Sequence, residues 1–218
     1  PKEDDLSEIL FTTGTTGKSK GIKIVYRNNV AIAQNVSEAI GITNDDVEMV
    51  TAPMNHSMAL RRTYTVFYKG GTVVLTDGVK FIEDFFKLLD MYNVTGLTFA
   101  PAILEQLLKF AKDRFGTYSD RLRYIQLGSA PLSEKAKETL KEMFPNTKLF
   151  NIYGATESGC TVSLEFSKYG DKKGSIGKPN VNAEIIFVDD NRNIVKASAQ
   201  NPGNLAFKGA MNMPGYLK

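Results

Sequence analysis

The sequence predicts an α/β fold with a mostly parallel sheet flanked by helices and an antiparallel, β-rich C-terminal tail. Short apolar runs alternate with helix-period segments, and strand–helix–strand repetition implies parallel strands covered by helices. After about Cys160 the pattern changes, because short apolar runs are then separated by turn residues such as Asn201-Pro202-Gly203. That second pattern is typical of antiparallel hairpins.

Six runs predict strands, because β-branched or other apolar residues dominate each of them. These runs are residues 9–11, 48–51, 71–75, 95–99, 122–127 and 148–152. Residues 21–26 also predict a strand. The expected strands of the tail are residues 184–188, 193–195 and 204–207.

Four segments carry apolar residues three and four positions apart, as amphipathic helices do. The first helix is expected to follow Asn28 and Asn29, which are plausible N-caps. The third begins near Pro101, whose missing N–H does no harm in a first turn, and the fourth extends from Ser133 to Pro145. The expected apolar faces include Val30, Ala33 and Val36, then Phe81, Phe85, Leu88 and Leu89, then Ile103, Leu104, Leu107, Leu108 and Ala111, and finally Ala136, Leu140, Met143 and Phe144. We expect Phe81, Phe85 and Phe86 to be core residues.

Composition limits the functional classes. The chain has 218 residues, which is enough for a core without a disulfide or metal. It has 27 Lys and Arg against 24 Asp and Glu, a net charge of +3, and the two signs are interleaved, so no nucleic-acid partner is expected. A single cysteine favours a reducing, cytoplasmic location. No run of about 18 apolar residues predicts a membrane span.

The most informative segment is residues 12–21, which follow a predicted strand and combine hydroxyls, glycines and lysines. Backbone N–H groups of such a loop converge on an anion, and lysines neutralise its charge, so the segment predicts a phosphate site. One alternative is a surface turn rich in Gly and Thr. A Walker loop is another, because Gly17, Lys18 and Ser19 match its second half, but its first glycine would fall at Thr12 and a helix should follow.

The loop resembles the phosphate-binding signature of the adenylate-forming superfamily, which comprises acyl-CoA synthetases, luciferases and the adenylation domains of peptide synthetases. Residues 11–21, FTTGTTGKSKG, agree with the family pattern at every position except Ser19, which replaces a proline. Residues 153–157, YGATE, match the family's Y-G-x-T-E signature. A Thr-Glu pair on its own would instead be a helix N-cap.

Other motifs follow in the family's order. Residues 126–132, QLGSAPL, resemble a turn that borders adenine and the acyl group, although an ordinary strand-to-helix turn would also satisfy them. The only histidine, His56, lies where the family places its acyl pocket, and capping of a helix is the equal alternative. Residues 174–179 and 203–217 resemble structural turns of the family. Cys160 has no neighbouring His to activate it, so a small, buried or half-buried role is expected.

The resemblance implies that a carboxylate attacks the α-phosphate of ATP, giving acyl-adenylate and pyrophosphate, and that a thiol, usually of coenzyme A or carrier-protein pantetheine, displaces AMP. It implies catalytic roles for Lys20, Thr156 and Glu157, with Glu157 also a ligand of Mg²⁺, and an acyl pocket at His56 and Gly128. The nucleotide-binding residues that it implies are Thr13, Gly14, Thr15, Thr16, Gly17, Lys20, Gly128, Ser129, Ala130, Asn151, Tyr153, Gly154 and Thr156.

On this resemblance, residues 1–160 form the nucleotide-binding subdomain and residues 161–218 continue the same domain. The family's ribose-binding Asp, hinge Arg and catalytic Lys would follow residue 217, and an N-terminal portion would precede the loop. We therefore expect the chain to be inactive alone and to need a C-terminal domain in cis. A stand-alone ATP- or AMP-binding module is the alternative. The expected substrate is a small carboxylic acid, and Met54 and Met58 favour an apolar one.

Overall fold

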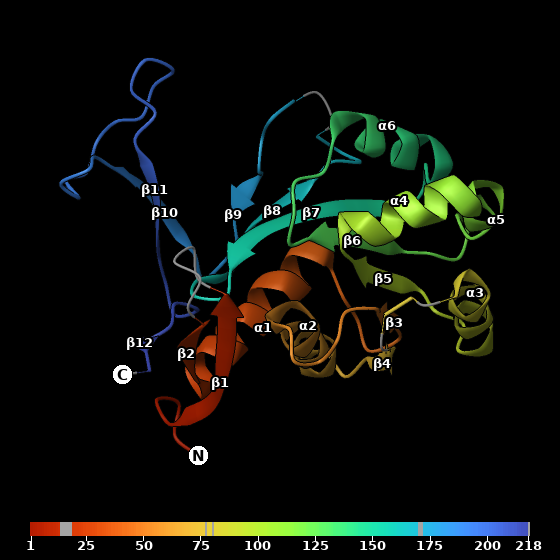
Figure 1. The fold of residues 1–218 in the computed structure, drawn as a ribbon, viewed down its shortest axis with the longest axis horizontal. Coiled ribbons are helices and arrows are strands. Elements are labelled where there is room, and N and C mark those ends of the chain that lie inside the picture. The colour runs from red at the N-terminus through yellow and green to blue at the C-terminus, as the bar shows by residue number, and fades with distance from the viewer. Residues whose placement is uncertain (14–18, 77, 80, 170–171, 218) are drawn as a thin grey trace.

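The computed structural model describes residues 1–13, 19–76, 78–79, 81–169 and 172–217. A seven-stranded sheet with the order β4-β3-β5-β6-β7-β8-β9 crosses the molecule (Figure 1). Its strands are β3 (Val47–Val50), β4 (Thr72–Leu75), β5 (Gly96–Phe99), β6 (Tyr124–Gly128), β7 (Lys148–Ala155), β8 (Gly159–Glu165) and β9 (Lys178–Pro179). Strands β3 to β7 pair in parallel, whereas β8 and β9 add to the sheet in antiparallel fashion. The predicted fold class is confirmed.

Helices cover both faces of this sheet (Figure 1). Helices α1 (Tyr26–Ile40) and α2 (Ser57–Tyr68) pack together on one face. The other face buries the apolar core, together with α3 (Ile82–Met91), α4 (Pro101–Phe110), α5 (Lys112–Gly116) and α6 (Glu134–Met143). As expected, Pro101 is the first residue of α4, and the Ser133 hydroxyl caps α6 by accepting from the Ala136 N–H at 3.2 Å.

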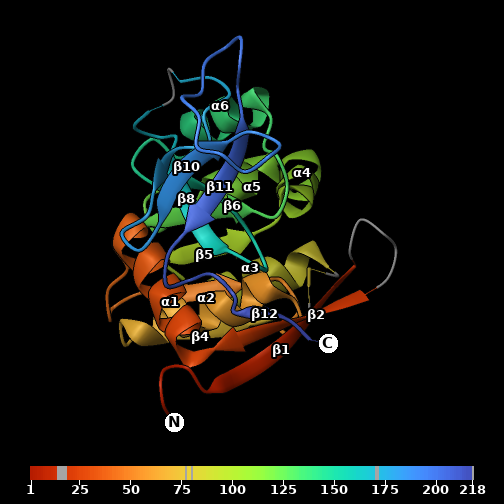
Figure 2. The ribbon, with the colours of Figure 1, turned by 90° about the vertical axis from the view of Figure 1, so that its left-hand side faces the viewer.

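Two smaller antiparallel sheets flank the large one. Strand β1 (Leu6–Thr13) pairs with β2 (Ser19–Val25), and β12 (Gly215–Tyr216) pairs with the other edge of β2. Figure 2 shows β12 beside β2, so the C-terminal end of the chain returns to the N-terminal hairpin. Strands β10 (Glu184–Val188) and β11 (Asn204–Lys208) form a separate hairpin. The β-rich tail is thus present, as predicted.

The first predicted helix begins earlier than expected. Its N-cap is Val25, and Asn28 occupies the third helical position, where its Oδ1 accepts from the Val25 N–H at 3.0 Å. Asn28 and Asn29 as N-caps were therefore a wrong prediction, because Asn28 lies inside the first turn and bonds back to the N–H of the N-cap residue Val25. Val30 is also not on the buried face, since its side chain is 53% exposed, whereas Ala33 and Val36 are buried.

Two further sequence predictions were wrong. Phe81 is 69% exposed because it precedes α3 as the N-cap residue, whereas Phe85 and Phe86 lie in the core as expected. Residues 193–195 form no strand: Ile194 makes a single bridge to Val188 and is 75% exposed, and the residues before it form a turn that the Asp189 N–H closes by donating to the Asn193 carbonyl at 2.9 Å. In the part of the chain that the structure describes, no helix is both long and apolar enough to cross a membrane.

Candidate active site

The turn between β7 and β8 holds Thr156 and Glu157 at the carboxyl end of the parallel strands, where open α/β sheets collect ligands. It is a turn between two strands, so the alternative of a helix N-cap is excluded. The hairpin is tight: a Cβ added to Gly154 would lie 1.8 Å from the Gly159 carbonyl oxygen. A glycine is required at position 154 because the two strands approach so closely there.

Side chains of helix α2 hold this turn in place through hydrogen bonds. The Ser57 and Thr156 hydroxyls share a hydrogen bond of 3.1 Å, in which either oxygen can donate. Arg61 donates from Nη1 to the Ala155 carbonyl at 3.2 Å and from Nη2 to the Thr156 carbonyl at 2.6 Å. Burial of the guanidinium lowers the pKa of Arg61. Thr156 is therefore held through both its side chain and its backbone.

The loop after β6 lies beside this turn. Ser129 has a φ of 68°, a left-handed conformation that is rare for a residue other than glycine and clusters at functional sites. Its hydroxyl lies 3.2 Å from the Met58 sulfur. Helix α6 begins at Glu134 with Ser133 as its N-cap, so Pro131 does not open the helix as that alternative expected.

A cavity of about 220 Å³, called here the α2 cavity, lies between helices α1 and α2 and strands β6 to β8. His56 and Gly128, the predicted acyl-pocket residues, both line it, together with Thr156. His56 also caps α2, because its Nδ1 accepts from the Met58 N–H at 3.1 Å. The capping alternative for this histidine is therefore observed, and its role in an acyl pocket stays a prediction. Met54 does not line the cavity and is exposed.

A second cavity of about 370 Å³, called here the β7 cavity, lies on the other side of the strand ends. Five predicted nucleotide-binding residues line it: Ser129, Ala130, Asn151, Tyr153 and Gly154. Ser129, Ile152 and Gly154 line both cavities, so the ends of β6 and β7 form a shared wall. The Tyr153 side chain is 45% exposed and offers its ring to a ligand.

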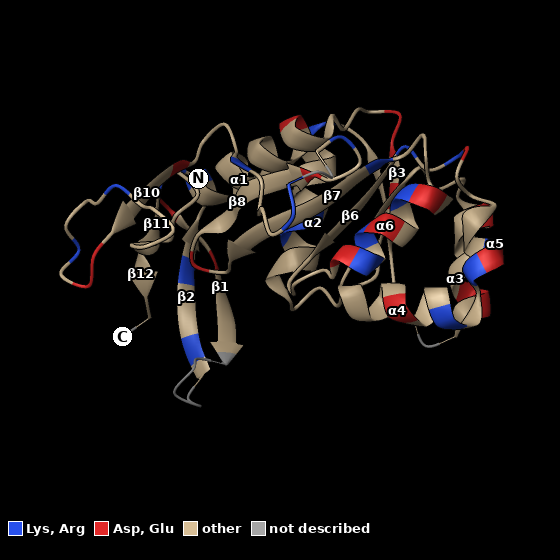
Figure 3. Ribbon diagram, turned by 90° about the horizontal axis from the view of Figure 1, so that it is seen from above, with Lys and Arg blue, Asp and Glu red and all other residues tan. Residues whose placement is uncertain are grey.

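Glu157 and Lys20 approach each other through Tyr216. The Tyr216 hydroxyl donates to Glu157 Oε1 at 3.1 Å, which raises the pKa of that tyrosine, and Lys20 Nζ lies 5.5 Å from the centre of the Tyr216 ring. The Glu157 carbonyl also accepts from the Met213 N–H at 2.9 Å. The predicted metal ligand therefore lies beside the β1–β2 hairpin. Figure 3 shows the lysines of β2 as blue bands along this hairpin, whereas both signs of charge mix on α4, α5 and α6.

Part of the predicted phosphate loop lies outside the described residues, namely Gly14, Thr15, Thr16 and Gly17. Its two flanks are described: Thr13 pairs with Ser19 at the end of the β1–β2 ladder, and Lys20 follows on β2. Because a strand rather than a helix follows the loop, the Walker alternative is excluded. Among the described residues, no group of three or more His, Cys, Asp or Glu could hold a metal ion.

Sequence reasoning missed several residues of the site. Arg61, Arg62 and Gln126 line the α2 cavity, and Tyr216 carries the contact to Glu157. The sequence does carry a signal for Arg61 and Arg62, because two adjacent arginines between apolar residues of one helix are unusual on a solvent-exposed helix face. Cys160 is half-buried, as expected, and burial raises the pKa of its thiol, so it is a poor nucleophile.

The fold and these motifs define a class of nucleotide-binding enzyme, and comparison with known protein families gives the same class. The chain belongs to the AMP-binding enzyme family, whose model matches residues 1–217. The resemblance inferred from the motifs is thereby confirmed.

Individual relatives share the same fold. A 4-coumarate-CoA ligase 1 from Narcissus pseudonarcissus is 30% identical over 98% of this chain and 40% of its own length. O-succinylbenzoate coenzyme A synthetase (MenE) from Bacillus subtilis, solved with ATP and a magnesium ion, is 26% identical with a TM-score of 0.85, over 99% of this chain and 43% of its own. The same enzyme solved with its acyl-adenylate intermediate is also 26% identical with a TM-score of 0.85, over 99% of this chain and 54% of its own. The chain spans about 40% of the length of the curated relatives.

Proposed function

We propose that the complete gene product adenylates a carboxylic acid with ATP and Mg²⁺, releases pyrophosphate, and passes the acyl group to the thiol of coenzyme A. One observation carries this proposal: two cavities share a wall at Ser129 and Gly154, and Thr156 lies next to that wall. A reaction that joins an acid to a nucleotide needs two binding sites that meet at one point. The MenE structures with ATP and with an acyl-adenylate support the same chemistry in a relative.

The β7 cavity is the proposed adenosine site. Its volume of about 370 Å³ falls within the range of about 300–1,000 Å³ that small-molecule sites occupy. Tyr153 would stack on the base, and Ser129, Ala130 and Asn151 would border it together with Gly128 and Gly154. The tight approach of Gly154 to Gly159 keeps the backbone, rather than a side chain, at the wall between the cavities.

The phosphates would lie between this cavity and the β1–β2 hairpin. Thr156 would donate to the α-phosphate, and Lys20 would neutralise the outer phosphates together with Thr13, Gly14, Thr15, Thr16 and Gly17. Glu157 is the proposed ligand of Mg²⁺, which fits because this ion is usually bound by one or two carboxylates together with substrate phosphates. When bound, the ion supplies charge neutralisation at the triphosphate.

The reaction itself places few demands on the protein. An oxygen of the carboxylate attacks the α-phosphorus, the bond from that phosphorus to the bridging oxygen breaks, and pyrophosphate leaves with the bonding electrons. No proton has to move. The chain's own residues would therefore act by orienting the carboxylate in line and by stabilising charge, which are the main sources of catalysis in such transfers. Thr156, Glu157 and Lys20 are the proposed catalytic residues.

The α2 cavity is the proposed acyl site. His56 and Gly128 would contact the acyl group, and the Ser57–Thr156 hydrogen bond lies at the end where the acid meets the nucleotide. We further propose that residues beyond this chain, in a C-terminal domain, complete the catalytic set. The chain alone is then expected to bind nucleotide without turning it over.

ATP–pyrophosphate exchange tests the proposal. In the complete gene product, Thr156→Val is expected to lower exchange by about tenfold or more, since it removes a donor to the reacting phosphate. The matched control is Thr139→Val on α6, whose hydroxyl bonds only the Lys135 carbonyl of its own helix. ATP binding without exchange for any acid would favour the alternative, a stand-alone nucleotide-binding module.

A further inference from the structure

The α2 cavity extends along helix α2 rather than across it. Ser57, Arg61 and Thr65 lie four positions apart and share one face of the helix, and all three line the cavity. At 1.5 Å per residue, this face measures about 12 Å from Ser57 to Thr65. One end lies at Thr156, where the acid would react. The other end lies among Arg62, Thr65 and Gln126, about two residues back along β6 from Gly128.

The inner part of this cavity holds buried polar groups without partners. Arg61 Nε, Arg62 Nη1 and Gln126 Oε1 make no hydrogen bond to any described residue. Their residues are 4%, 3% and 3% exposed. Because buried polar atoms in native proteins are normally paired, three such groups around one cavity indicate a ligand that supplies the missing partners.

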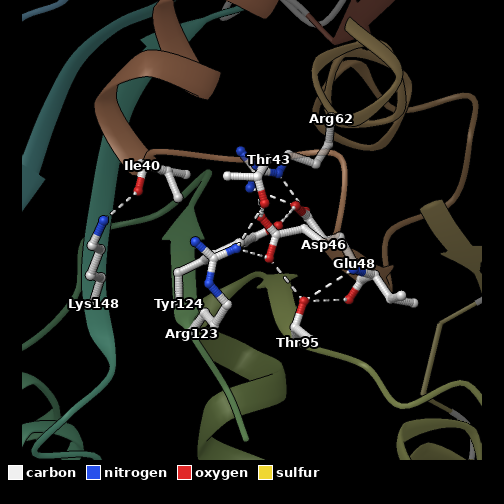
Figure 4. A network of polar contacts seen from close by, with 10 residues as sticks. Ile40, Thr43, Asp46, Glu48, Arg62, Thr95, Arg123, Tyr124 and Lys148 are labelled. Atoms are coloured by element: carbon white, nitrogen blue, oxygen red, sulfur yellow. Dashed lines mark hydrogen bonds and ion pairs between the residues drawn. The ribbon is translucent and has the colours of Figure 1, made fainter. Parts of the chain in front are cut away.

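The charges around the cavity favour an anion. Arg62 is paired with Glu48 through Nε and Nη2, the latter at 2.7 Å, and the Tyr124 hydroxyl donates to the same carboxylate at 2.6 Å (Figure 4). Three of the roughly four acceptor positions of Glu48 are therefore occupied by Arg62 and Tyr124. Arg61 itself bonds only two backbone carbonyls, and among the described residues it has no salt bridge. Arg61 is thus a buried cation without a direct carboxylate contact, and the carboxylates that act on its charge are Glu8 and Glu157.

We propose, on the basis of the proposed function, that the α2 cavity takes the acyl part of a short acid whose far end carries a second carboxylate. The distal carboxylate would accept from Arg62 Nη1 and from the Gln126 amide, which can turn to present its NH₂ group, whereas the Arg61 guanidinium lies at the reacting end against the Thr156 carbonyl. Since a cavity of about 150 Å³ holds benzene, a volume of 220 Å³ suits an acyl group of roughly nine heavy atoms. This inference replaces the apolar acid that Met54 and Met58 favoured, because only Met58 lines the cavity.

The test uses the complete gene product and two matched panels in ATP–pyrophosphate exchange. One panel is adipate, its ω-hydroxy analogue and hexanoate, and the other is terephthalate, 4-hydroxybenzoate and benzoate. We expect kcat/KM to be about tenfold to hundredfold higher for the dicarboxylate of at least one panel, the range that charge-assisted hydrogen bonds give. Exchange that favours the hydroxy or the plain acid overturns this inference alone. If no acid of either panel supports exchange, the proposed function is overturned as well.

Two variants locate the effect. Gln126→Leu removes the amide and Arg62→Lys removes Nη1 while keeping a cation opposite Glu48. Each is expected to reduce the preference for the dicarboxylate by about tenfold, measured as the ratio of kcat/KM for the dicarboxylate to kcat/KM for the plain acid. Thermal unfolding identifies a variant that does not fold, and Gln126→Leu then decides, because it breaks no buried ion pair. A folded Gln126→Leu variant with an unchanged preference would contradict the assignment.

Discussion

The two faces of the large sheet differ in chemistry although the same strands build both. The side chains that face α3 to α6 are apolar and fully buried, and they include Leu97, Phe99, Ile125, Leu127 and Leu149. The alternate positions, which face α1 and α2, include Glu48, Thr98, Tyr124, Gln126 and Gly128, of which Glu48, Thr98 and Gln126 are polar and buried. Because successive side chains of a strand point to opposite faces, one set of strands can serve two purposes.

The difference shows how stability and binding are separated in this domain. Burying a large apolar side chain contributes about 1.5–3 kcal/mol, so the α3–α6 face supplies most of the folding energy. A buried ion pair such as Glu48–Arg62 contributes little net stability, because desolvation offsets the attraction. The α1–α2 face buries only a smaller apolar cluster, around Val36, Ile40 and Phe150, and its buried ion pair adds little to that stability.

The largest expected effect lies on the apolar face. Phe115 is fully buried and its ring centre lies 4.7 Å from that of Phe144. Phe115→Ala is expected to lower the free energy of unfolding by about 3–5 kcal/mol, the usual cost of an aromatic-to-alanine cavity. Urea denaturation followed by circular dichroism measures it. ATP affinity of the folded variant should be unchanged, and a marked loss of affinity would show that the two faces are not separate.

A smaller effect is expected from the polar network around Asp46. This carboxylate is buried and accepts from the Thr43 N–H at 2.8 Å, from the Thr95 hydroxyl at 3.0 Å and from Arg123 (Figure 4). Burial alone would raise its pKa, but these hydrogen bonds outweigh burial and the pKa of Asp46 is lowered from its ordinary value of 3.8. Asp46→Asn is expected to destabilise the domain by about 1–3 kcal/mol at neutral pH.

The pH dependence gives the sign of this effect. Because the folded-state pKa lies below the ordinary value, the carboxylate stabilises the domain above about pH 4 and loses that contribution as the pH falls through the lower folded value. Unfolding free energies measured between neutral pH and pH 3 should therefore fall more steeply in the parent than in Asp46→Asn. Parallel curves for the two proteins would mean that Asp46 is not the group responsible.

Much of the fold could be predicted from the sequence, because the apolar face produces a strong local signal. Runs such as residues 95–99 and 122–127 coincide with β5 and β6 within two residues. The turn at Thr156 and Glu157 was found from its motif alone. Local signals failed at Asn28, whose side chain bonds the backbone from inside the first turn instead of capping the helix. They also failed at Phe81, which has the spacing of the apolar face but precedes the first residue of α3.

The polar face was harder to predict, since its partners lie far apart in the sequence. Glu48 meets Arg62 and Tyr124 across 14 and 76 positions. Gly96 is required there because a Cβ would lie 2.2 Å from the Tyr124 ring, a constraint that only the folded chain creates. The alternation of polar and apolar residues in residues 124–128 does indicate two unlike faces. It does not tell which helix supplies the partners.

Substitution of Arg61 is expected to have the smallest effect on stability but a measurable effect on catalysis. This residue connects the polar face to the reacting centre. Arg61→Met keeps the length of the side chain but removes both donors to the Ala155 and Thr156 carbonyls. In the complete gene product, kcat for exchange with a plain monocarboxylic acid should fall about tenfold, equal to about 1.4 kcal/mol, while KM for that acid stays nearly constant. Stability should change by less than about 1 kcal/mol, because a buried cation without a carboxylate partner is removed together with its bonds. Arg61→Lys restores one donor and should recover part of kcat. A positioning role for Arg61 would be wrong if Arg61→Met lost stability but retained full kcat, since the polar face would then act through folding as the apolar face does.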